Sequence, residues 1–203
     1  PGQTRALLMD DATVIEAWQD QAHEPDLTDS VHRVRVDRVF MAQGRATARL
    51  ADGAPVSVRL GRRDPVKAGH MATITIVAAP REGKPWQAVP GARLVGRHVI
   101  LLPSEAGIAS SSRMPEPLPA DVMAQLTEML GATPGFGVIL RRDAGAAHDL
   151  PAQLSALIAD WTGGVTDTPG EGCLYGGEGL HGRLSRSCPG LPVDVVVPET
   201  AAG

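Results

Sequence analysis

The sequence predicts an α+β protein in which a small antiparallel β-barrel is followed by an α/β unit. Between residues 31 and 77, short runs alternate apolar and polar residues with the period of two that half-buried strands require. After about residue 90, buried-type strands alternate with amphipathic helices, and this order indicates an α/β unit.

The N-terminal thirty residues predict a hairpin and an acidic loop. The runs 4–9 and 13–18 have the composition of strands. Asp10–Ala12 between them is expected to be a turn, because aspartate tolerates turn dihedrals and bonds its own backbone. Residues 20–30 are acidic and loop-like.

Four alternating runs predict the barrel or a small sandwich, with turns at Gly44, Asp52–Gly53 and Lys67–Gly69. These runs are 31–40, 45–50, 56–60 and 71–77. In the first run, the alternation places Val31, Arg33, Arg35 and Asp37 on one face and His32, Val34, Val36 and Arg38 on the other. We expect the arginines of the barrel strands to lie on the face away from the core.

The second half predicts strands and helices in turn. A buried-type strand covers 97–103, and an amphipathic helix covers 120–130 and is closed by Gly131. A second strand covers 137–141, and Asp149 is the expected N-cap of a helix that stops at Gly163–Gly164. A short helix over 180–187 and a last strand over 193–197 complete the prediction.

Charge is sorted along the chain. Residues 1–30 carry a net charge of −6, residues 31–100 carry +9 and residues 101–203 carry −7. A basic middle block inside an acidic protein is the expected footprint of a polyanion site. A solvated surface that is rich in arginine is the alternative.

Composition narrows the class of protein. Aromatic residues make up only 3% of the chain, so stacking platforms for single-stranded nucleic acid cannot be numerous. The cysteines, Cys173 and Cys188, are too few for a disulfide scaffold or a thiolate zinc site. The chain has no apolar run long enough to span a bilayer and no signal-peptide pattern at its start. We therefore expect a cytoplasmic protein without membrane contact.

The strongest local pattern is Pro134–Gly145, where a buried strand delivers Arg141 and Arg142 to a turn rich in small residues. Guanidinium groups beside loop amides suit a phosphate, because arginine offers forked donors and the backbone adds N–H groups. An ordinary strand end with solvated arginines is the alternative.

From Val89 onward, the chain resembles the ribonuclease E/G family in the order and spacing of its segments. Leu101–Pro103 resembles the family's "LMP" strand end, and Gly135–Arg142 resembles its "GxGLIxRT" motif. The similarity extends over nearly the whole chain, through Arg5–Met9, Trp18, Arg35–Val39, Asp52–Gly53, Gly107–Met114, Ile158–Trp161, Gly172–Tyr175 and Pro192–Pro198.

This resemblance implies the N-terminal half of such a protein. An RNase H-like subdomain, with a sheet built from residues 1–32 and 164–203, would enclose an OB-fold barrel over 33–88 and a 5′-sensor over 89–163. The implied partner is RNA, single-stranded with a 5′-monophosphate. The family's magnesium-binding aspartates and zinc-linking cysteines lie beyond the matched region. No cofactor is therefore expected in this chain. Magnesium is expected only where the catalytic domain is present.

The resemblance also implies individual roles. Gly96 and Ile100 stand where the sensor strand supplies backbone groups, and Arg141 stands at the sensor arginine. Lys84 matches an RNA-contacting lysine of the OB-fold, and the basic strand of that barrel carries the candidate RNA-binding residues Arg35 and Arg38.

Some positions depart from the family pattern. Arg142 replaces a threonine, and Ser112 stands where a second sensor arginine is usual, with Arg113 beside it. Both arginines remain candidates for phosphate binding. The aromatic positions that stack on RNA are filled by Ala48, Leu50 and Val58, so we expect binding mainly through backbone electrostatics.

A nuclease mechanism needs converging carboxylates that hold magnesium and activate water. Asp10, Asp11, Glu16 and Asp194 are the candidates, but adjacent acids in a tight turn are more often turn formers, and strand neighbours point to opposite faces. The histidines show no metal-ligand spacing.

The sequence thus leaves three interpretations open. The chain is an RNA-binding, 5′-phosphate-sensing module, a divergent magnesium-dependent endoribonuclease, or an interaction scaffold with vestigial RNA binding. Whether it forms a homo-oligomer or binds a partner protein is also left open.

Overall fold

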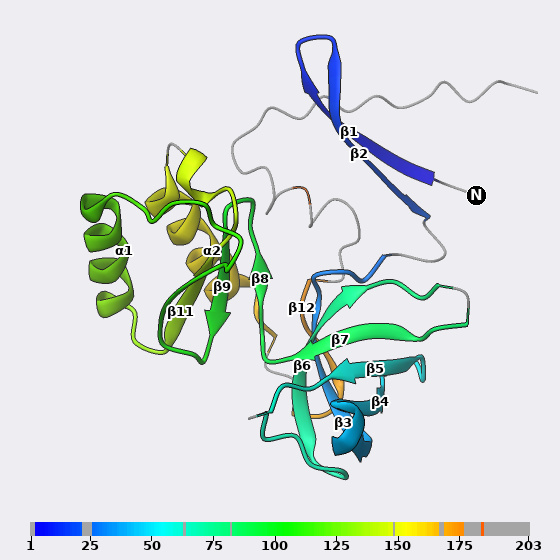
Figure 1. Ribbon diagram of the computed structural model, residues 1–203. Helices are drawn as coiled ribbons and strands as arrows, with labels where there is room; N and C mark the ends of the chain where they lie inside the picture. The colour runs from blue at the N-terminus through cyan, green and yellow to red at the C-terminus, as the bar shows by residue number, and fades with distance from the viewer. Residues whose placement is uncertain are drawn as a thin grey trace, which may run out of the picture.

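The protein is described here by a computed structural model, which covers residues 3–21, 26–62, 64–81, 83–147, 149–166, 169–176 and 184. Within these ranges it is a mixed α+β structure made mostly of strands, with two α-helices (Figure 1). The predicted α+β class is confirmed.

Five strands form a closed β-barrel. They are β3 (Val31–Phe40), β4 (Arg45–Arg49), β5 (Pro55–Arg59), β6 (Met71–Ala78) and β7 (Trp86–Pro90). Neighbours follow the order β3-β4-β5-β7-β6, and β6 pairs back onto β3. All pairs in this circuit are antiparallel except β5–β7, which is parallel. Closure leaves the circuit without an unpaired strand edge.

The barrel core consists of small and branched apolar side chains that alternate with outward residues along the strands. Its buried members are Val34, Val36, Ala46, Ala48, Leu50, Val56, Val58, Ile74, Ile76 and Ala88. The alternation predicted for 45–50 is confirmed, since Ala46 and Ala48 are buried between exposed Arg45 and Arg49. A narrow barrel needs small inward residues, and alanine at two successive inward positions of β4 meets that need.

Strand β3 contains a bulge that changes which side chains face outward. Val36 and Arg38 pair with consecutive residues of β4, so Asp37 is an extra residue in the strand. Val39, rather than Arg38, therefore packs against the barrel core, and Arg38 is exposed. The prediction that placed Arg38 on the same face as Val36 is wrong for this reason.

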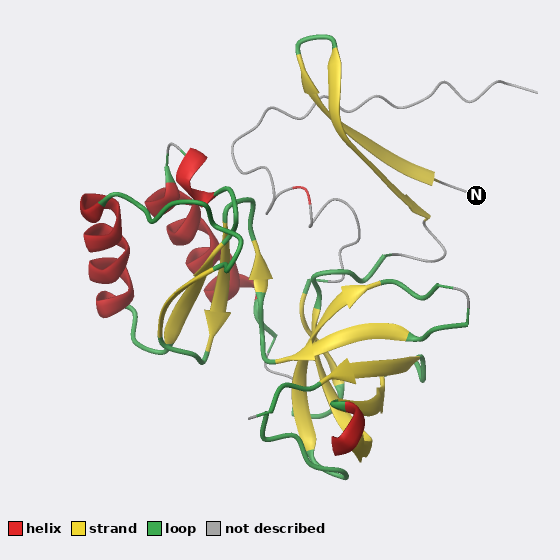
Figure 2. Cartoon of the chain, viewed as in Figure 1, coloured by secondary structure: helices red, strands yellow, loops and turns green. Residues whose placement is uncertain are grey.

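The α/β unit is a four-stranded sheet with two helices on one face (Figure 2). Its strands, in the spatial order β10-β11-β9-β8, are β8 (Leu94–Val95), β9 (Val99–Pro103), β10 (Gly107–Ser110) and β11 (Phe136–Leu140). Helix α1 (Ala120–Ala132) connects the parallel strands β10 and β11, and helix α2 (Leu150–Gly164) follows β11. Strand β9 runs antiparallel to β11.

The ends of the two helices differ in how well the sequence predicts them. The Ala152 N–H donates to the Asp149 carboxylate at 3.0 Å, which confirms Asp149 as the N-cap of α2. Helix α1 continues past Gly131 to Ala132 and ends at Thr133, whose hydroxyl donates to the Met129 carbonyl at 2.8 Å. The expectation that Gly131 closes this helix is wrong.

Strand β12 (Gly172–Tyr175) joins the barrel to the α/β unit, because it pairs with the beginning of β3 while its side chains pack into the α/β core. The Tyr175 hydroxyl donates to the Asp160 carboxylate on α2, and its ring lies 5.6 Å from that of Trp161 between centroids. Val31, at the start of β3, is also fully buried in the α/β core. The two units therefore share strand β3.

The N-terminal hairpin is confirmed. Strands β1 (Gln3–Asp10) and β2 (Thr13–Gln21) pair antiparallel as a sheet of their own around a turn in which Asp11 has φ +49°. The predicted helix 180–187, apart from residue 184, and the predicted strand 193–197 lie outside the described residues. The sheet built from both chain ends therefore stays a prediction.

The packing of β10 against β11 depends on the absence of a side chain at Gly137. A Cβ there would lie 2.9 Å from the Gly107 carbonyl oxygen and 3.0 Å from that of Glu105, both backbone atoms. We predict that Gly137→Ala lowers the free energy of unfolding by about 2 kcal/mol, because a strand must shift to admit the methyl group. Urea denaturation followed by circular dichroism measures this change.

Gly131→Ala is the matched control. Nothing lies within 4 Å of a Cβ at Gly131, and this glycine is helical. The same substitution should raise the free energy of unfolding by about 0.5 to 1 kcal/mol there. Equal effects at the two glycines would contradict the close approach of β10 to β11.

Stability should depend on pH through His32. This side chain is 6% exposed, its Nε2 lies 2.8 Å from the Ser30 hydroxyl, and burial lowers its pKa below the ordinary 6.5, partly opposed by the Asp52 carboxylate. The folded protein thus binds this proton less tightly than the unfolded chain. Stability is unaffected above the unfolded pKa and falls as the pH drops from 6.5 through the folded pKa.

We therefore predict that His32→Gln makes the free energy of unfolding less sensitive to pH between about 7.5 and 5. Urea midpoints at several pH values measure the slope for each protein. An unchanged slope in the variant would mean that His32 does not titrate differently in the folded state.

Candidate nucleic-acid interface

Arginines occupy outward positions on three neighbouring strands of the barrel. Because the valines and alanines between them fill the barrel core, the guanidinium groups have only the outer surface available. We define the barrel arginine face as the exposed residues Arg35 and Arg38 on β3, Arg45 and Arg49 on β4, and Arg59 on β5. Part of the basic block of the sequence therefore gathers on adjacent strands.

Two of these arginines are held by other groups of the protein. Arg35 Nε lies 3.3 Å from the Glu171 carboxylate, and its Nη1 donates to the Gly69 carbonyl at 3.0 Å. Arg49 Nε lies 3.9 Å from Asp37, and its Nη1 donates to the Gly53 carbonyl at 3.2 Å. Their charge is partly compensated within the fold.

The other three arginines of this face are uncompensated. Arg38, Arg45 and Arg59 form no ion pair with any residue in the described ranges. An exposed group of like charges raises the local concentration of anions, and the phosphate backbone of a nucleic acid is one polyanion that Lys and Arg side chains neutralise.

The residues that sequence similarity placed at the RNA-stacking positions do not lie on this surface. Ala48, Leu50 and Val58 are 2%, 4% and 1% exposed and belong to the barrel core. Their side chains point inward because they occupy the apolar half of an alternating strand. The residues that the resemblance places at the stacking positions therefore have no side chain on the outer surface of the barrel.

Lys84 lies in the loop between β6 and β7 and is exposed. Its N–H donates to the Arg81 carbonyl at 2.8 Å, so the backbone makes a tight turn that presents both cations to solvent. This loop leads directly into Trp86, the first residue of β7, which is half-buried.

A second basic cluster lies at one edge of the α/β sheet. Parallel strands β10 and β11 end at this edge, and antiparallel β9 begins there. The Ser111 N–H donates to the Leu140 carbonyl at 2.8 Å, which ties the ends of β10 and β11 together. The edge therefore gathers segments that are distant in sequence.

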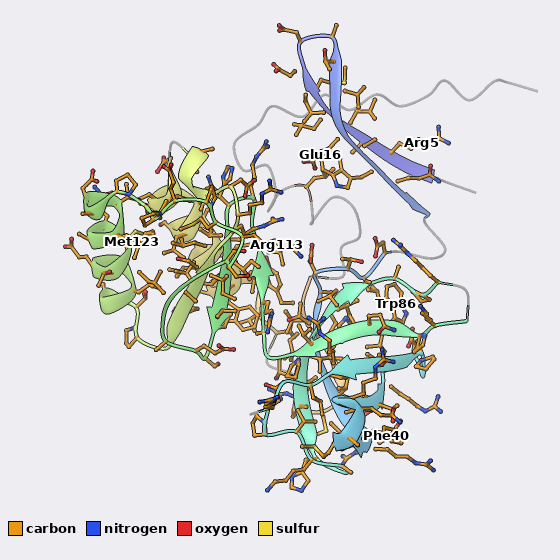
Figure 3. All side chains as sticks on the ribbon, in the orientation of Figure 1. Arg5, Glu16, Phe40, Trp86, Arg113 and Met123 are labelled. Atoms are coloured by element: carbon orange, nitrogen blue, oxygen red, sulfur yellow. The ribbon has the colours of Figure 1, made fainter. Side chains whose placement is uncertain are left out.

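We define the sheet-edge arginines as Arg97 before β9, Arg113 after β10, and Arg141 and Arg142 after β11. All four are exposed. Figure 3 shows Arg113 on the side of the α/β unit opposite Met123 of α1. None of the four forms an ion pair within the described part of the chain.

Arg141 is the most firmly positioned of these residues. Its Nη1 donates to the Gly96 carbonyl at 2.7 Å, and its backbone N–H donates to the His98 carbonyl at 2.9 Å. A guanidinium has five N–H donors, so this anchor leaves four of them for a ligand. The anchored side chain loses little conformational freedom when it binds an anion.

The backbone expected at the phosphate is arranged differently. The Gly96 N–H donates to the Val99 carbonyl at 2.9 Å, and its carbonyl accepts from Arg141, so both groups already have partners. Ile100 lies within β9, between Ile139 of β11 and Val95 of β8. In this structure Gly96 contributes to the site through its carbonyl, which accepts a hydrogen bond from the Arg141 guanidinium.

Gly96 also has a steric reason to be glycine. A Cβ there would lie 3.0 Å from a methyl group of Leu157 and 3.1 Å from the Val99 carbonyl oxygen. Helix α2 thus packs directly on the turn that anchors Arg141. His98, in the same turn, lies 3.2 Å through Nδ1 from the Gln153 side chain of α2.

Carboxylates lie near this edge without neutralising it. Asp143 and Asp149 both belong to the connection between β11 and α2, and both are exposed. The Asp149 carboxylate caps α2, and neither residue reaches Arg141 or Arg142 in an ion pair.

The acidic residues considered for magnesium do not form a cluster where they are described. Asp10, Asp11 and Glu16 lie on the β1–β2 hairpin, and Asp194 lies outside the described residues. Among the residues that the structure places, no group of three or more histidine, cysteine, aspartate or glutamate side chains could hold a metal ion.

Sequence reasoning missed Phe40, Arg45, Arg59 and Arg97 as candidate residues. The turn at Asp52–Gly53 could have identified Arg45 and Arg59 as neighbours. A hairpin centred there pairs Arg49 with Pro55 and, four residues further, Arg45 with Arg59, as observed. The convergence of Arg97 with Arg141 needs the order of strands in the α/β sheet, which no local pattern specifies.

Comparison with known proteins finds no family model and no curated protein that matches the chain. No helix in the described part of the chain combines the length and the apolar character needed to cross a membrane.

Proposed function

We propose that this chain is the RNA-binding, 5′-phosphate-sensing portion of a ribonuclease E/G-like protein that works in the cytoplasm. The observation that carries the proposal is that the sheet-edge arginines follow or precede strand ends that lie side by side, and that Arg141 is anchored there. These arginines come from three separate segments and have no carboxylate partner among the described residues. Such a cluster suits a terminal phosphate, which carries more negative charge than an internal one.

The barrel supports the same proposal. A closed five-stranded barrel with this strand order is consistent with an OB-type fold, in which the second and third strands bind oligonucleotides. Here those strands are β4 and β5, and they carry Arg45, Arg49 and Arg59. RNA that crosses this face would meet cations along its backbone, while its 5′-end is held at the sheet edge.

Recognition at the sheet edge would use Arg141 as the principal donor. Its guanidinium keeps enough free N–H groups to bind two phosphate oxygens in a forked arrangement, with Gly96 fixing its orientation. Arg142 and Arg113 add charge on either side. A 5′-hydroxyl end offers no such anion. The site would therefore distinguish an RNA with a 5′-monophosphate from an RNA of the same sequence with a 5′-hydroxyl.

We predict that the protein binds a short single-stranded RNA with a 5′-monophosphate about tenfold more tightly than the same RNA with a 5′-hydroxyl. Arg141→Ala should remove this preference by lowering affinity for the monophosphorylated RNA alone. Fluorescence anisotropy at low salt, with a label at the 3′-end, measures both affinities.

Lys67→Ala is the matched control, because this exposed lysine lies in the loop between β5 and β6, outside the sheet edge. Any loss of affinity in this variant should be equal for the two RNAs, so the preference for the 5′-monophosphate should stay intact. A wild-type protein that binds the two RNAs equally, or an Arg141→Ala variant that keeps the preference, would contradict phosphate sensing at this edge.

A further inference from the structure

The outer face of the barrel holds a row of three side chains in which two arginines of the barrel arginine face line up with an aromatic residue that the proposed function does not use. Phe40 on β3 pairs in register with Arg45 on β4, and Arg45 pairs with Arg59 on β5. Residues that are directly opposite on neighbouring strands project from the same face. The adjacent residue on each strand packs in the barrel core, so this row faces solvent. These neighbours are Val39, Ala46 and Val58.

The row combines features that oppose stability in the free protein. Like charges placed directly opposite on adjacent strands repel each other. Phe40 is 39% exposed and the adjacent Met41 is 69% exposed. Arg45 and Arg59 have no carboxylate partner in the described ranges, whereas Arg49, four residues further along β4, is paired with Asp37.

A phosphate between Arg45 and Arg59 would convert their repulsion into a forked interaction with one anion. The neighbouring row adds a third cation and the half-buried Thr47 hydroxyl, since Arg38 pairs with Thr47. The exposed ring of Phe40 is one strand away from Arg45 and two strands away from Arg59. An aromatic face beside a phosphate-binding pair suits a nucleotide, whose base and phosphate are joined through one sugar.

We propose that Phe40, Arg45 and Arg59 form a binding row for one nucleotide of single-stranded RNA, with the base stacked on Phe40 and the adjacent phosphate held between the two arginines. This deepens the proposed function and rests on it. Single-stranded RNA is the ligand that fits, because in a duplex each base is already stacked between its neighbours and cannot cover Phe40.

The row also accounts for how this barrel can bind bases although Ala48, Leu50 and Val58 are buried. The aromatic ring is supplied by the end of β3, next to the 3₁₀ helix η1 (Met41–Gln43), instead of by β4 or β5. The bulge at Asp37 makes this possible, because it sets the outward direction of both Arg38 and Phe40.

The test measures binding of a 5′-hydroxyl single-stranded oligouridylate and of an RNA duplex of the same length at low salt. The 5′-hydroxyl ends keep the sheet edge out of the measurement. We expect Phe40→Ala and Phe40→Leu to lower the affinity for the single strand about tenfold, because stacking requires a ring. Phe40→Trp should bind the single strand like the wild type. Duplex affinity should be the same in all three variants.

The arginines are tested by the double variant Arg45→Gln/Arg59→Gln against Lys67→Gln, which removes an exposed cation from the loop between β5 and β6, outside the barrel arginine face. The double variant should reduce the slope of log affinity against log salt by roughly 1, and Lys67→Gln should leave it nearly unchanged. Because repulsion is removed, the urea midpoint of the double variant should be no lower than that of the wild type, so weaker binding cannot be ascribed to unfolding.

The outcomes separate this inference from the proposed function. If the wild type binds the single strand but Phe40→Leu and the double variant bind it equally well, the row is overturned and RNA binding elsewhere stands. If the wild type binds no RNA at all, both fail together. If Phe40→Leu lowers the affinity for the single strand and for the duplex alike, the ring does not stack on a base and the proposed binding row is overturned.

Discussion

The structure depends on strand β3, which is shared by the two packed units of the protein. Its first half pairs with β12 on one side and β6 on the other, and its second half pairs with β4. Val31 is buried in the α/β core, whereas Val34 and Val36 are buried in the barrel core. A single strand therefore closes the barrel and fixes the α/β unit on it.

The bulge at Asp37 connects this constraint to the proposed function. One extra residue lets β3 bend and reverses its alternation, so that Val39 fills the barrel core while Arg38 and Phe40 turn outward. Without it, a charged side chain would face an apolar interior, which is costly unless that charge is paired. The same local feature that permits closure thus assembles part of the candidate RNA surface.

Much of the barrel could be predicted because its physical basis is local. Alternation identified the β4 strand, and the turn at Asp52–Gly53 contains enough information to fix its register with β5. The cap at Asp149 was predicted because the carboxylate bonds its own helix. These features depend on residues a few positions apart in the chain.

The remainder could not be predicted, because it depends on partners distant in sequence. The short strands β8 and β10 carry no alternation, and they exist because β9 and β11 offer edges for pairing. Nothing in the sequence around Asp37 indicates a bulge. The resemblance to the ribonuclease E/G family places Ala48 and Val58 at stacking positions, whereas the alternation of their strands places them on the core face, where they lie.

Nuclear magnetic resonance of the isotope-labelled protein, titrated with a short 5′-monophosphorylated single-stranded RNA, tests the central claim most directly. The account predicts that perturbed amide and guanidinium signals fall on the outward residues of β3, β4 and β5 and on the turn and strand end around Arg141. Perturbations confined to the β1–β2 hairpin or to helix α1, or none at a saturating concentration of RNA, would contradict it.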